Sequence, residues 1–482
     1  MFTKNILLFG AGKSATVLID YLLNEAANNN WKITIADANQ NLLDQKIRNH
    51  SNGEGVVIDI QNDLTRSSII EKSDLVISMM PPSLHILIAK DCIRYKKSLL
   101  TASYVDDAIK SLSKEVDNAD ILFLCELGLD PGIDHMSAMQ LLDEIHESGG
   151  QVHSFKSHCG GLVAPASDNN PWKYKISWNP RNVVMAGKAG AIYKKSGTIV
   201  EESYETLFDP SRIVSIHQDN IINLSYYPNR NSLPYIDLYN LNSTDTFIRT
   251  TLRYPDFMYG WNNIIELGLT DESPIYDTNG KTLQDFFRDF LSTRSFDTWL
   301  DQKLSVRFAI ANALLESLLD EQGKIKTTEL TKDDLEASAV MAEKMHEANI
   351  TLKQLLFLGL DDNQTIINKG LCSAAEVLQF ALEEKLKLEP TDKDMIVMLH
   401  EIEYTINQTH KSIQSSLVVI GDDSMRTAMA KTVGLPLGIT AKLILNGTIQ
   451  LKGVHIPIMK EVYEPVLNEL KHYGVVFQEK RL

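Results

Sequence analysis

The sequence has few cysteines, no basic excess and no long apolar run, and each shortage excludes a class of protein. Its four cysteines are far apart and form neither a Cys-x-x-Cys pair nor a Cys/His ligand spacing, so we expect reduced thiols and no metal site. Its 63 acidic residues outnumber 47 basic ones, and the net charge of −16 disfavours a nucleic-acid partner. No apolar run approaches the ~20 residues of a membrane helix, and the N-terminal run is too short for a secretory signal. We therefore expect a cytoplasmic protein that binds neither membranes nor nucleic acids.

Proline is absent between Pro274 and Pro390, where helix-start patterns recur. Each pattern places a hydroxyl side chain three positions before an acidic one, ahead of an apolar-periodic run. The three patterns are Thr282-x-x-Asp285, Thr331-x-x-Asp334 and Ser373-x-x-Glu376. This segment predicts an all-helical subdomain. Beyond it, we expect strands over 416–420 and 448–451 and a helix near 424–433.

The first 130 residues alternate short apolar segments with stretches of helix length. The apolar segments cover residues 5–9, 32–36, 55–59, 74–78, 98–102 and 120–124. Six strands joined by crossovers predict an α/β fold, a Rossmann-type doubly wound parallel sheet with helices on both faces. A ligand of such a sheet binds at the carboxyl ends of its strands.

A glycine-rich turn follows the first expected strand. Gly10-x-Gly12-x-x-Ala15 matches the dinucleotide fingerprint, in which glycines allow a tight turn and the approach of a pyrophosphate. The helix expected over 13–28 presents N–H groups and its positive end to phosphate. We therefore expect Gly10, Gly12, Lys13, Ser14 and Ala15 to bind the cofactor.

Asp37 ends the second expected strand, where a carboxylate can accept both hydroxyls of an adenosine ribose. It would repel a 2′-phosphate, and residues 36–39 include no arginine to bind one. The residue favours NAD as cofactor, with NADP as the alternative. The other interpretation is a solvated aspartate after a strand.

From about residue 151 the pattern changes to alternating segments joined by Gly, Pro, Asn and Asp turns. The segments cover 151–157, 192–193 with 198–200, 213–216, 222–226 and 246–253. This pattern is typical of antiparallel strands that carry functional loops. We predict three domains. These are a dinucleotide-binding domain over 1–129, an α+β substrate and dimerisation domain with a mixed sheet over 130–270 and 394–482, and the helical subdomain over 271–393.

Together these motifs resemble the glutamate-forming saccharopine dehydrogenases, in the family's order and over nearly the whole chain. The matching stretches are Gly10–Gly12, Thr101-Ala-Ser-Tyr104, Glu126-Leu-Gly-Leu-Asp-Pro-Gly-Ile-Asp-His135, Cys159-Gly-Gly-Leu162 with Ala164-Pro165, Asn170-Pro171 through Trp178, Tyr227-Pro-Asn-Arg-Asn-Ser232, Thr251-Leu-Arg253, Met395-Ile-Val-Met398 through Glu401, and Ala428-Met-Ala-Lys-Thr-Val-Gly434.

The resemblance implies oxidation of saccharopine by a nicotinamide cofactor and water, giving glutamate and 2-aminoadipate 6-semialdehyde, or the reverse reaction. It places Ser103, Tyr104 and Asp130 at the substrate. It also implies that the segment 129–135 lines the cofactor, through Leu129, Asp130, Pro131 and His135. Substrate carboxylates would be held by Arg230, Thr251, Leu252 and Arg253. The arginines suit this role because a guanidinium binds a carboxylate in a bidentate fork, and we expect them on adjacent strands.

The chemistry needs a proton acceptor for the amine and an acid for collapse of a carbinolamine. The candidates are Tyr104, Asp130 and His135, although His135 could instead only start a helix over 135–146. Asp134 could be the N-cap of that helix. Cys159 could touch substrate, but the reaction needs no nucleophilic thiol.

Two other functions stay open at this point. A carboxynorspermidine-type dehydrogenase would reduce a related imine, but its substrate lacks the third carboxylate that two arginines suit. A non-catalytic nucleotide sensor would need Gly10, Gly12 and Asp37 but none of the substrate residues. For a soluble enzyme we expect a homodimer.

Overall fold

The first domain is built on a parallel sheet, as the sequence predicts. The structure is a computed structural model that describes residues 3–216, 223–303, 346–347 and 349–482. Within these residues the sheet has seven strands in the order β18-β6-β5-β4-β1-β2-β3. They are β1 (Asn5–Phe9), β2 (Lys32–Asp37), β3 (Gly53–Val57), β4 (Leu75–Ser78), β5 (Ser98–Thr101), β6 (Leu122–Leu124) and β18 (Gly453–His455). The six expected strands are confirmed, and the seventh comes from the far end of the chain.

Helices cover both faces of this sheet because successive strand residues, which point to opposite faces, are apolar. Ile6 and Leu8 of β1 join one buried cluster, while Leu7 and Phe9 join another on the opposite face. The helices of the first 120 residues are η1 (Lys13–Ala15), α1 (Thr16–Asn29), α2 (Gln40–Ile47), α3 (Asp63–Glu71), α4 (Pro82–Tyr95), α5 (Asp107–Ser111) and α6 (Ser113–Ala119). The helix expected over 13–28 is therefore a short 3₁₀ turn followed by α1.

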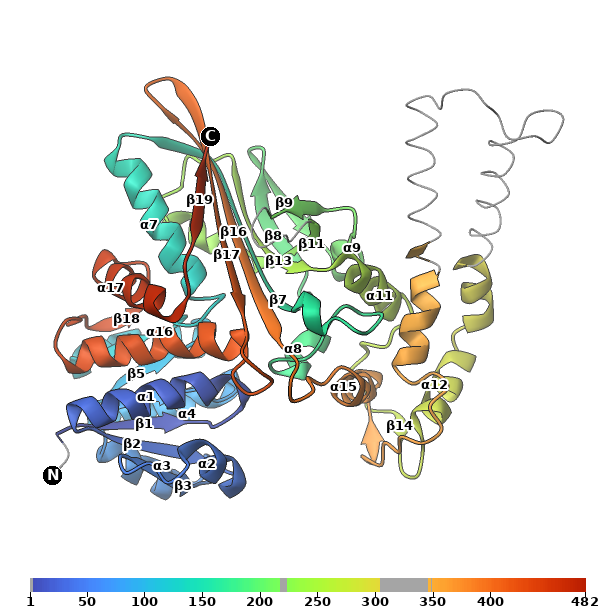
Figure 1. Cartoon of the computed structure of the whole chain (residues 1–482), viewed down its shortest axis with the longest axis horizontal. Helices are drawn as coiled ribbons and strands as arrows, with labels where there is room; N and C mark the ends of the chain where they lie inside the picture. The colour runs from blue at the N-terminus through green and yellow to red at the C-terminus, as the bar shows by residue number, and fades with distance from the viewer. Residues whose placement is uncertain (1–2, 217–222, 304–345, 348) are drawn as a thin grey trace.

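A larger sheet forms the second domain, and it is mixed. Along its main path the order is β10-β11-β13-β7-β16-β17-β19. Off this path β8 pairs with β13, and β9 and β12 pair with β8. The β7·β13 and β8·β12 pairs are parallel, and the others are antiparallel. Its strands are β7 (Gln151–Val163), β8 (Ala191–Lys195), β9 (Thr198–Glu202), β10 (Ile213–Ser215), β11 (Asn223–Pro228), β12 (Arg230–Asn231), β13 (Thr246–Arg253), β16 (Asp394–Ile406), β17 (Thr409–Ile420) and β19 (Gln478–Arg481). The long helix α7 (Ile133–Glu147) packs beside this sheet and leads into it from the first domain (Figure 1).

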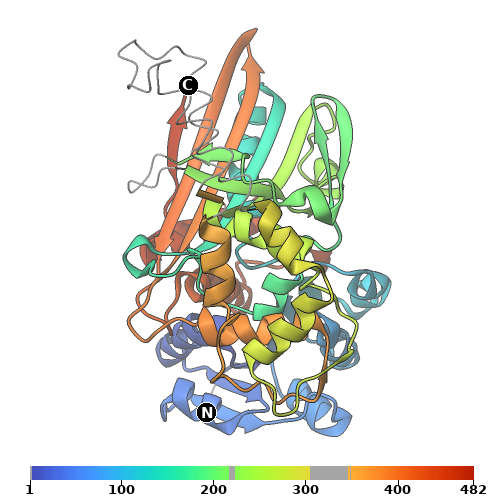
Figure 2. The ribbon, with the colours of Figure 1, turned by 90° about the vertical axis from the view of Figure 1, so that its right-hand side faces the viewer.

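The third region is mostly helical, and its buried cluster, which includes Phe287, is shared with the second domain through residues such as Trp172 and Trp261. Figure 2 shows its helices turned toward the viewer, in front of the sheets. The helices that lie wholly within the described residues between 148 and 393 include η2 (Pro165–Ser167), α8 (Pro180–Val184), α9 (Tyr204–Leu207), α10 (Pro234–Leu238), α11 (Pro255–Glu266), α12 (Leu283–Ser292) and α15 (Ala374–Lys385).

The capping boxes at Thr282 and Ser373 are confirmed, each with both reciprocal hydrogen bonds. The box expected at Thr331 lies outside the described residues. One part of the prediction is wrong. The subdomain is not purely helical, because β14 (Tyr276–Asp277) pairs with β15 (Leu371–Cys372).

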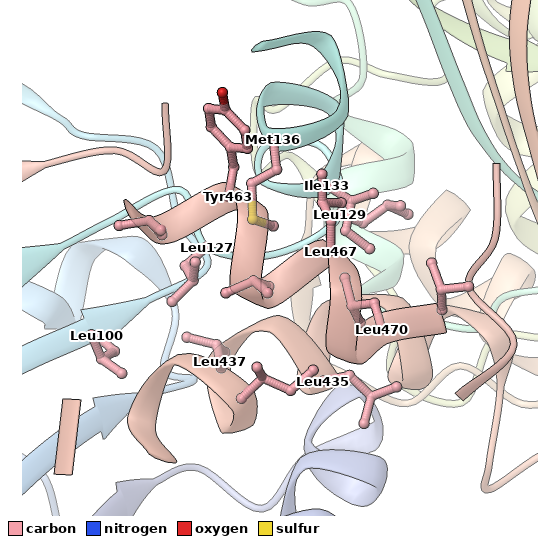
Figure 3. Packing of buried hydrophobic residues seen from close by; sticks show 14 of the residues in the cluster. Leu100, Leu127, Leu129, Ile133, Met136, Leu435, Leu437, Tyr463, Leu467 and Leu470 are labelled. Carbon is pink, nitrogen blue, oxygen red and sulfur yellow. The ribbon is translucent and has the colours of Figure 1, made fainter. Parts of the chain in front are cut away.

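The C-terminal part divides between the two sheets, which differs from the predicted assignment of 394–482 to the second domain. Strands β16, β17 and β19 extend the second sheet. The elements between β17 and β19 lie against the first domain instead (Figures 1 and 3). They are α16 (Ala428–Leu445), β18, α17 (Lys460–Leu470) and η3 (Lys471–Tyr473). The strand expected over 448–451 is absent from this described stretch, and β18 follows it instead. The helix expected near 424–433 is α16.

Two glycines explain how closely α16 approaches α1. A methyl group on Gly434 would lie 2.8 Å from the backbone nitrogen of Leu18, and one on Gly438 would lie 2.5 Å from the Tyr21 ring. Among the described residues, α16 is also the one helix that is long and apolar enough to cross a membrane. However, 72% of this 18-residue stretch is buried inside the protein. It serves as a core helix here, packed against Leu129, Ile133 and the α17 residues Leu467 and Leu470 in the cluster that Figure 3 draws.

Candidate active site

The glycine turn after β1 has the geometry of a dinucleotide site. Gly10 has a φ of +96°, and a Cβ there would lie 3.0 Å from the Met79 carbonyl oxygen, so the position needs glycine. Gly12 precedes η1, and nothing lies within 4 Å of the place where its Cβ would be. The helical segment that follows presents N–H groups without intrahelical partners at this open side. The residues present therefore fit a bound pyrophosphate.

Two side chains from the next β-α unit hold this turn. Asp37 accepts hydrogen bonds from the backbone N–H of Ala11 at 2.7 Å and of Asn39 at 2.9 Å. The buried ammonium of Lys46 donates to the Gly12 carbonyl oxygen at 2.8 Å and to the Thr16 hydroxyl at 2.5 Å. Burial lowers the pKa of Lys46 to about 8. Asp37 thus lies at the expected place, where its carboxylate also braces the turn.

Beyond the turn, the loop after β5 carries Ser103 and Tyr104, both half-buried. Glu126, which follows β6, fixes this loop. Its backbone N–H donates to the Ser103 carbonyl oxygen at 3.0 Å, and its carboxylate accepts from the Val105 N–H at 3.1 Å. The same carboxylate accepts from the Tyr235 hydroxyl at 3.0 Å and lies 2.9 Å from Nε2 of His135. Glu126 therefore joins the first domain, α7 and the second domain.

An arginine that the sequence reasoning missed dominates the charge of the site. One guanidinium nitrogen of Arg249 donates to Asp130 and to Asp134, 2.6 Å from each, and its Cζ lies 4.4 Å from the centre of the Tyr235 ring. The Tyr104 hydroxyl is 3.4 Å from the same Asp130 oxygen.

The environments of the two aspartates differ. Burial raises the pKa of Asp130 above its usual range, against the opposing charge of Arg249. For Asp134 burial also acts to raise the pKa, but the charges of His135 and Arg249 and the Gly132 N–H bond outweigh it and hold that pKa below its usual range. Asp134 is not the N-cap of α7, because Gly132 occupies that position. The role of Asp134 is to hold Arg249.

His135 is the third residue of α7, so it lies in the first turn of the helix, close to the predicted helix start, and not at the open edge of the site. Its side chain is fully buried, with Nδ1 2.5 Å from the Tyr239 hydroxyl and Nε2 on Glu126. Leu129 and Pro131 are buried too, so Asp130 is the member of this predicted cofactor segment that reaches the surface of the site. The cofactor contacts of the segment stay a prediction. The position of His135 favours a part in orienting Glu126 and α7.

Strand β13 presents its functional residues on one face. Arg249, Thr251 and Arg253 alternate along the strand and share a side with Cys159, which pairs with Thr251 in register. Leu252 points the other way into a separate apolar cluster, so only its backbone faces the site. Burial raises the pKa of the Cys159 thiol well above its usual range, which leaves a neutral thiol beside the cluster.

The two predicted carboxylate-binding arginines have different surroundings. Arg253 is 4% exposed, its Cζ lies 5.3 Å from the centre of the Tyr174 ring and 5.4 Å from that of Phe257, and its Nε has no hydrogen-bond partner. Arg230 is exposed, with a φ of +54° and its Cζ 5.2 Å from the centre of the Tyr104 ring. The expectation of adjacent strands is wrong, because β12 pairs with β8 and not with β13. Within the described residues neither arginine has a carboxylate at ion-pair distance.

Fold and site together define a Rossmann-type dinucleotide-binding protein with a second domain that presents arginines to the nucleotide edge. Residues 6–124 match the family model "Saccharopine dehydrogenase NADP binding domain", and residues 128–475 match "Saccharopine dehydrogenase C-terminal domain". The chain belongs to the saccharopine dehydrogenase family.

Known relatives agree with this assignment. The chain is 32% identical to the saccharopine dehydrogenase [NADP(+), L-glutamate-forming] of Saccharomyces cerevisiae over 99% of both chains. It is also 32% identical to the alpha-aminoadipic semialdehyde synthases of Arabidopsis thaliana and Mus musculus, but spans only 45% and 47% of their lengths, about half of these longer proteins.

Solved structures extend the likeness to the fold. The apo saccharopine dehydrogenase (L-Glu forming) of S. cerevisiae matches with a TM-score of 0.79 and 29% identity, over 99% of this chain and all of that one. A homospermidine synthase from Legionella pneumophila, solved with NAD, matches with a TM-score of 0.52 at 10% identity over 100% of this chain and 92% of that one, which shows a shared fold alone.

Proposed function

We propose that this protein is a glutamate-forming saccharopine dehydrogenase. It would oxidise saccharopine with a nicotinamide dinucleotide and water, giving glutamate and 2-aminoadipate 6-semialdehyde, or catalyse the reverse reaction. The observation that carries the proposal is Arg253, a buried guanidinium with an unsatisfied Nε and no carboxylate partner within the described residues. A buried charge is costly unless an opposite charge accompanies it, so this geometry is that of a site completed by an anionic ligand.

A tricarboxylate substrate suits the distribution of charge. The charge of Arg249 is already matched by Asp130 and Asp134, whereas Arg253 and Arg230 are left for carboxylates of a ligand. Arg230 lies beside the Tyr104 ring, and Arg253 lies on the face of β13 that also carries Arg249, so a long ligand that extends from Tyr104 along this face would meet them in turn. This arrangement favours saccharopine over the smaller carboxynorspermidine-type substrate, and the relatives' names point the same way.

The side chains also supply the proton chemistry. The bound nicotinamide would accept a hydride from the carbon next to the secondary amine, and the chain must hold and move the protons. Asp130 has partial exposure and a raised pKa, so it suits the role of proton acceptor from the amine. Burial raises the pKa of Tyr104 as well, so its hydroxyl remains protonated and can donate to Asp130 or to a ligand. Arg249 would orient the Asp130 carboxylate throughout.

For the nucleotide itself two lines of argument differ. The names of the family model and of the fungal relatives include NADP, whereas Asp37 puts a carboxylate at the end of β2, where its negative charge would repel a 2′-phosphate. The nearby cation, Lys46, is buried and already engaged by Gly12 and Thr16. The chain's own residues favour NAD, and the comparison of kcat/KM for the two nucleotides decides the question.

Absorbance at 340 nm tests the proposed reaction directly. Purified protein with saccharopine and NAD or NADP at alkaline pH is expected to form reduced cofactor together with glutamate. Cofactor binding without turnover would instead indicate a nucleotide sensor. Turnover of a related imine but not of glutamate plus semialdehyde would indicate the carboxynorspermidine-type activity.

A cytoplasmic location and a homodimer remain part of the proposal. The composition supports the first, and the exposed edge strand β19, which pairs only with β17 in the described sheet, offers a surface for the second. Light scattering on the purified protein measures the assembly state.

A further inference from the structure

A buried imidazole lies beneath the reacting edge and has no role in the function proposed above. His85 is in the first turn of α4, is 3% exposed, and contacts residues at the carboxyl ends of two neighbouring strands. Its Nδ1 lies 2.8 Å from the Ser78 hydroxyl at the end of β4. Its Nε2 lies 3.2 Å from the hydroxyl of Thr101, the last residue of β5, and 2.8 Å from the hydroxyl of Ser103, just after that strand.

This arrangement fixes the backbone N–H and the hydroxyl of Ser103. The backbone N–H of Ser103 donates to the Thr101 hydroxyl at 3.2 Å, while its side chain meets the imidazole. Burial lowers the pKa of His85 to about 4, so the ring is neutral and presents one donor and one acceptor nitrogen. The hydroxyl of Ser103 is thereby held in one direction while the residue itself remains half-buried at the edge of the site.

We propose that His85 is a positioning residue that orients the Ser103 hydroxyl toward the reacting groups. The inference rests on the proposed function, because the reacting groups are those of saccharopine and the nicotinamide. His85 itself touches neither. It acts through Ser103, because its hydrogen bond holds the Ser103 side chain in one rotamer. A displacement of a positioning group by about 1 Å can lower the reaction rate roughly 100-fold.

Two substitutions of His85 test the contacts of Nδ1 and Nε2 separately. A glutamine amide reaches the position of Nε2 and retains a partner for Ser103, whereas an asparagine amide reaches only Nδ1 and retains the Ser78 contact. We expect His85→Asn to lower kcat/KM for saccharopine by about 10- to 100-fold and His85→Gln to lower it by no more than about threefold. Cofactor affinity, measured by fluorescence titration, should stay unchanged in both variants.

A second buried histidine provides the matched control. His400 is also fully buried, with Nε2 2.8 Å from the Ser137 hydroxyl and a pKa that burial lowers to about 4, but it lies between β16 and α7. His400→Asn should lower the melting temperature about as much as His85→Asn while kcat/KM stays near the wild-type value. In the background of Ser103→Ala, His85→Asn should have no further effect on kcat/KM.

Several outcomes would overturn the inference. Equal activities of His85→Asn and His85→Gln would do so, as would additive losses in the Ser103→Ala background or a loss of cofactor affinity in His85→Asn. The failure of the proposed function is distinguishable, because it appears in the wild-type protein as an absence of turnover with saccharopine. With an active wild type, the variants test His85 alone.

Discussion

Asp37 and Ala11 are joined by a 2.7 Å hydrogen bond from the Ala11 N–H to the Asp37 carboxylate, which ties the end of β2 to the glycine turn. The residue that would select the nucleotide therefore also shapes the site that binds the pyrophosphate. A substitution at this position must separate charge from hydrogen bonding, because a loss of both would weaken NAD and NADP alike.

Asp37→Asn makes this separation. The amide oxygen can still accept from the Ala11 N–H, only the bond from the Asn39 N–H is lost, and the negative charge that repels a 2′-phosphate is removed. We expect the ratio of kcat/KM for NADP over that for NAD to rise by about tenfold or more, since tenfold corresponds to only about 1.4 kcal/mol. Initial rates with both nucleotides measure the ratio. An unchanged ratio would show that Asp37 does not face the ribose.

Gly12→Ala tests the open space above the turn. Gly12 has a φ of −61° and no atom within 4 Å of a Cβ, so the folded protein tolerates the methyl group without strain. We expect an unchanged melting temperature and at least about tenfold weaker dinucleotide binding, because the backbone could no longer approach a pyrophosphate. Gly132→Ala is the contrasting variant. Its Cβ would lie 2.1 Å from the Gly128 carbonyl oxygen, and a large loss of stability is expected.

Replacement of Arg253 tests the substrate assignment. Arg253→Lys keeps the charge but loses the planar fork, and Arg253→Ala loses both. We expect the KM for saccharopine to rise about tenfold in the first and about 100-fold in the second, with dinucleotide affinity unchanged. Arg230→Ala should raise the same KM. Normal saccharopine kinetics in Arg253→Ala would refute the proposed orientation of the substrate along β13.

Arg249→Met should destabilise the fold and change its dependence on pH. Removal of the guanidinium leaves the buried carboxylates of Asp130 and Asp134 without their shared ion-pair partner, and the loss of such a partner typically costs about 3–5 kcal/mol. The pKa values of both carboxyls would then rise in the folded state. Because a neutral carboxyl is less costly to bury than a carboxylate, protonation at lower pH reduces the destabilisation of the variant. The difference in unfolding free energy between the wild type and the variant is therefore expected to be largest near pH 7 and to narrow toward pH 4. Urea titrations at several pH values measure it, and a gap that widens on acidification would contradict this account.

Glu401 provides a pH-dependent contribution away from the site. A hydrogen bond from His158, 3.3 Å away, followed by the charges of His158 and Lys156, lowers the pKa of Glu401 to about 2. A depressed folded-state pKa means stabilisation that is present above the ordinary value of 4.5 and is lost as the pH falls from there toward 2. Glu401→Gln should flatten the fall in stability over that window while the saccharopine kinetics stay unchanged. An equally steep fall in the variant would remove Glu401 from the explanation.

Much of the first domain could be predicted because its signals are local. Alternation of apolar runs with helix-length segments, and glycines at a strand end, depend on neighbouring residues alone. Strand β18 could not be predicted in the same way. It has three residues, begins with a glycine that has a φ of +93°, and pairs with β6, which is far away in the sequence. Long-range pairing of this kind leaves no periodic signal.

In the site, too, some residues have a local sequence signal and others do not. Gly10, Asp37, Arg230 and Arg253 stand in recognisable motifs, whereas Arg249 stands in a strand where an isolated arginine usually makes a surface ion pair. A signal was nevertheless present, since alternation along β13 puts Arg249 on the same face as Arg253. For His85 there was none. It lies within an amphipathic helix, and its importance depends on two strand ends that only folding brings together.

The return of the chain from the second sheet to the first has a consequence for synthesis. β18 closes the edge beside β6, and α16 covers α1 through the close contacts of Gly434 and Gly438. A ribosome that has released only the first 130 residues has therefore released a nucleotide-binding unit with an unpaired edge and an uncovered apolar face. Completion of that unit waits for residues 428–470, so a truncation before them should yield aggregating protein rather than an independent cofactor-binding fragment.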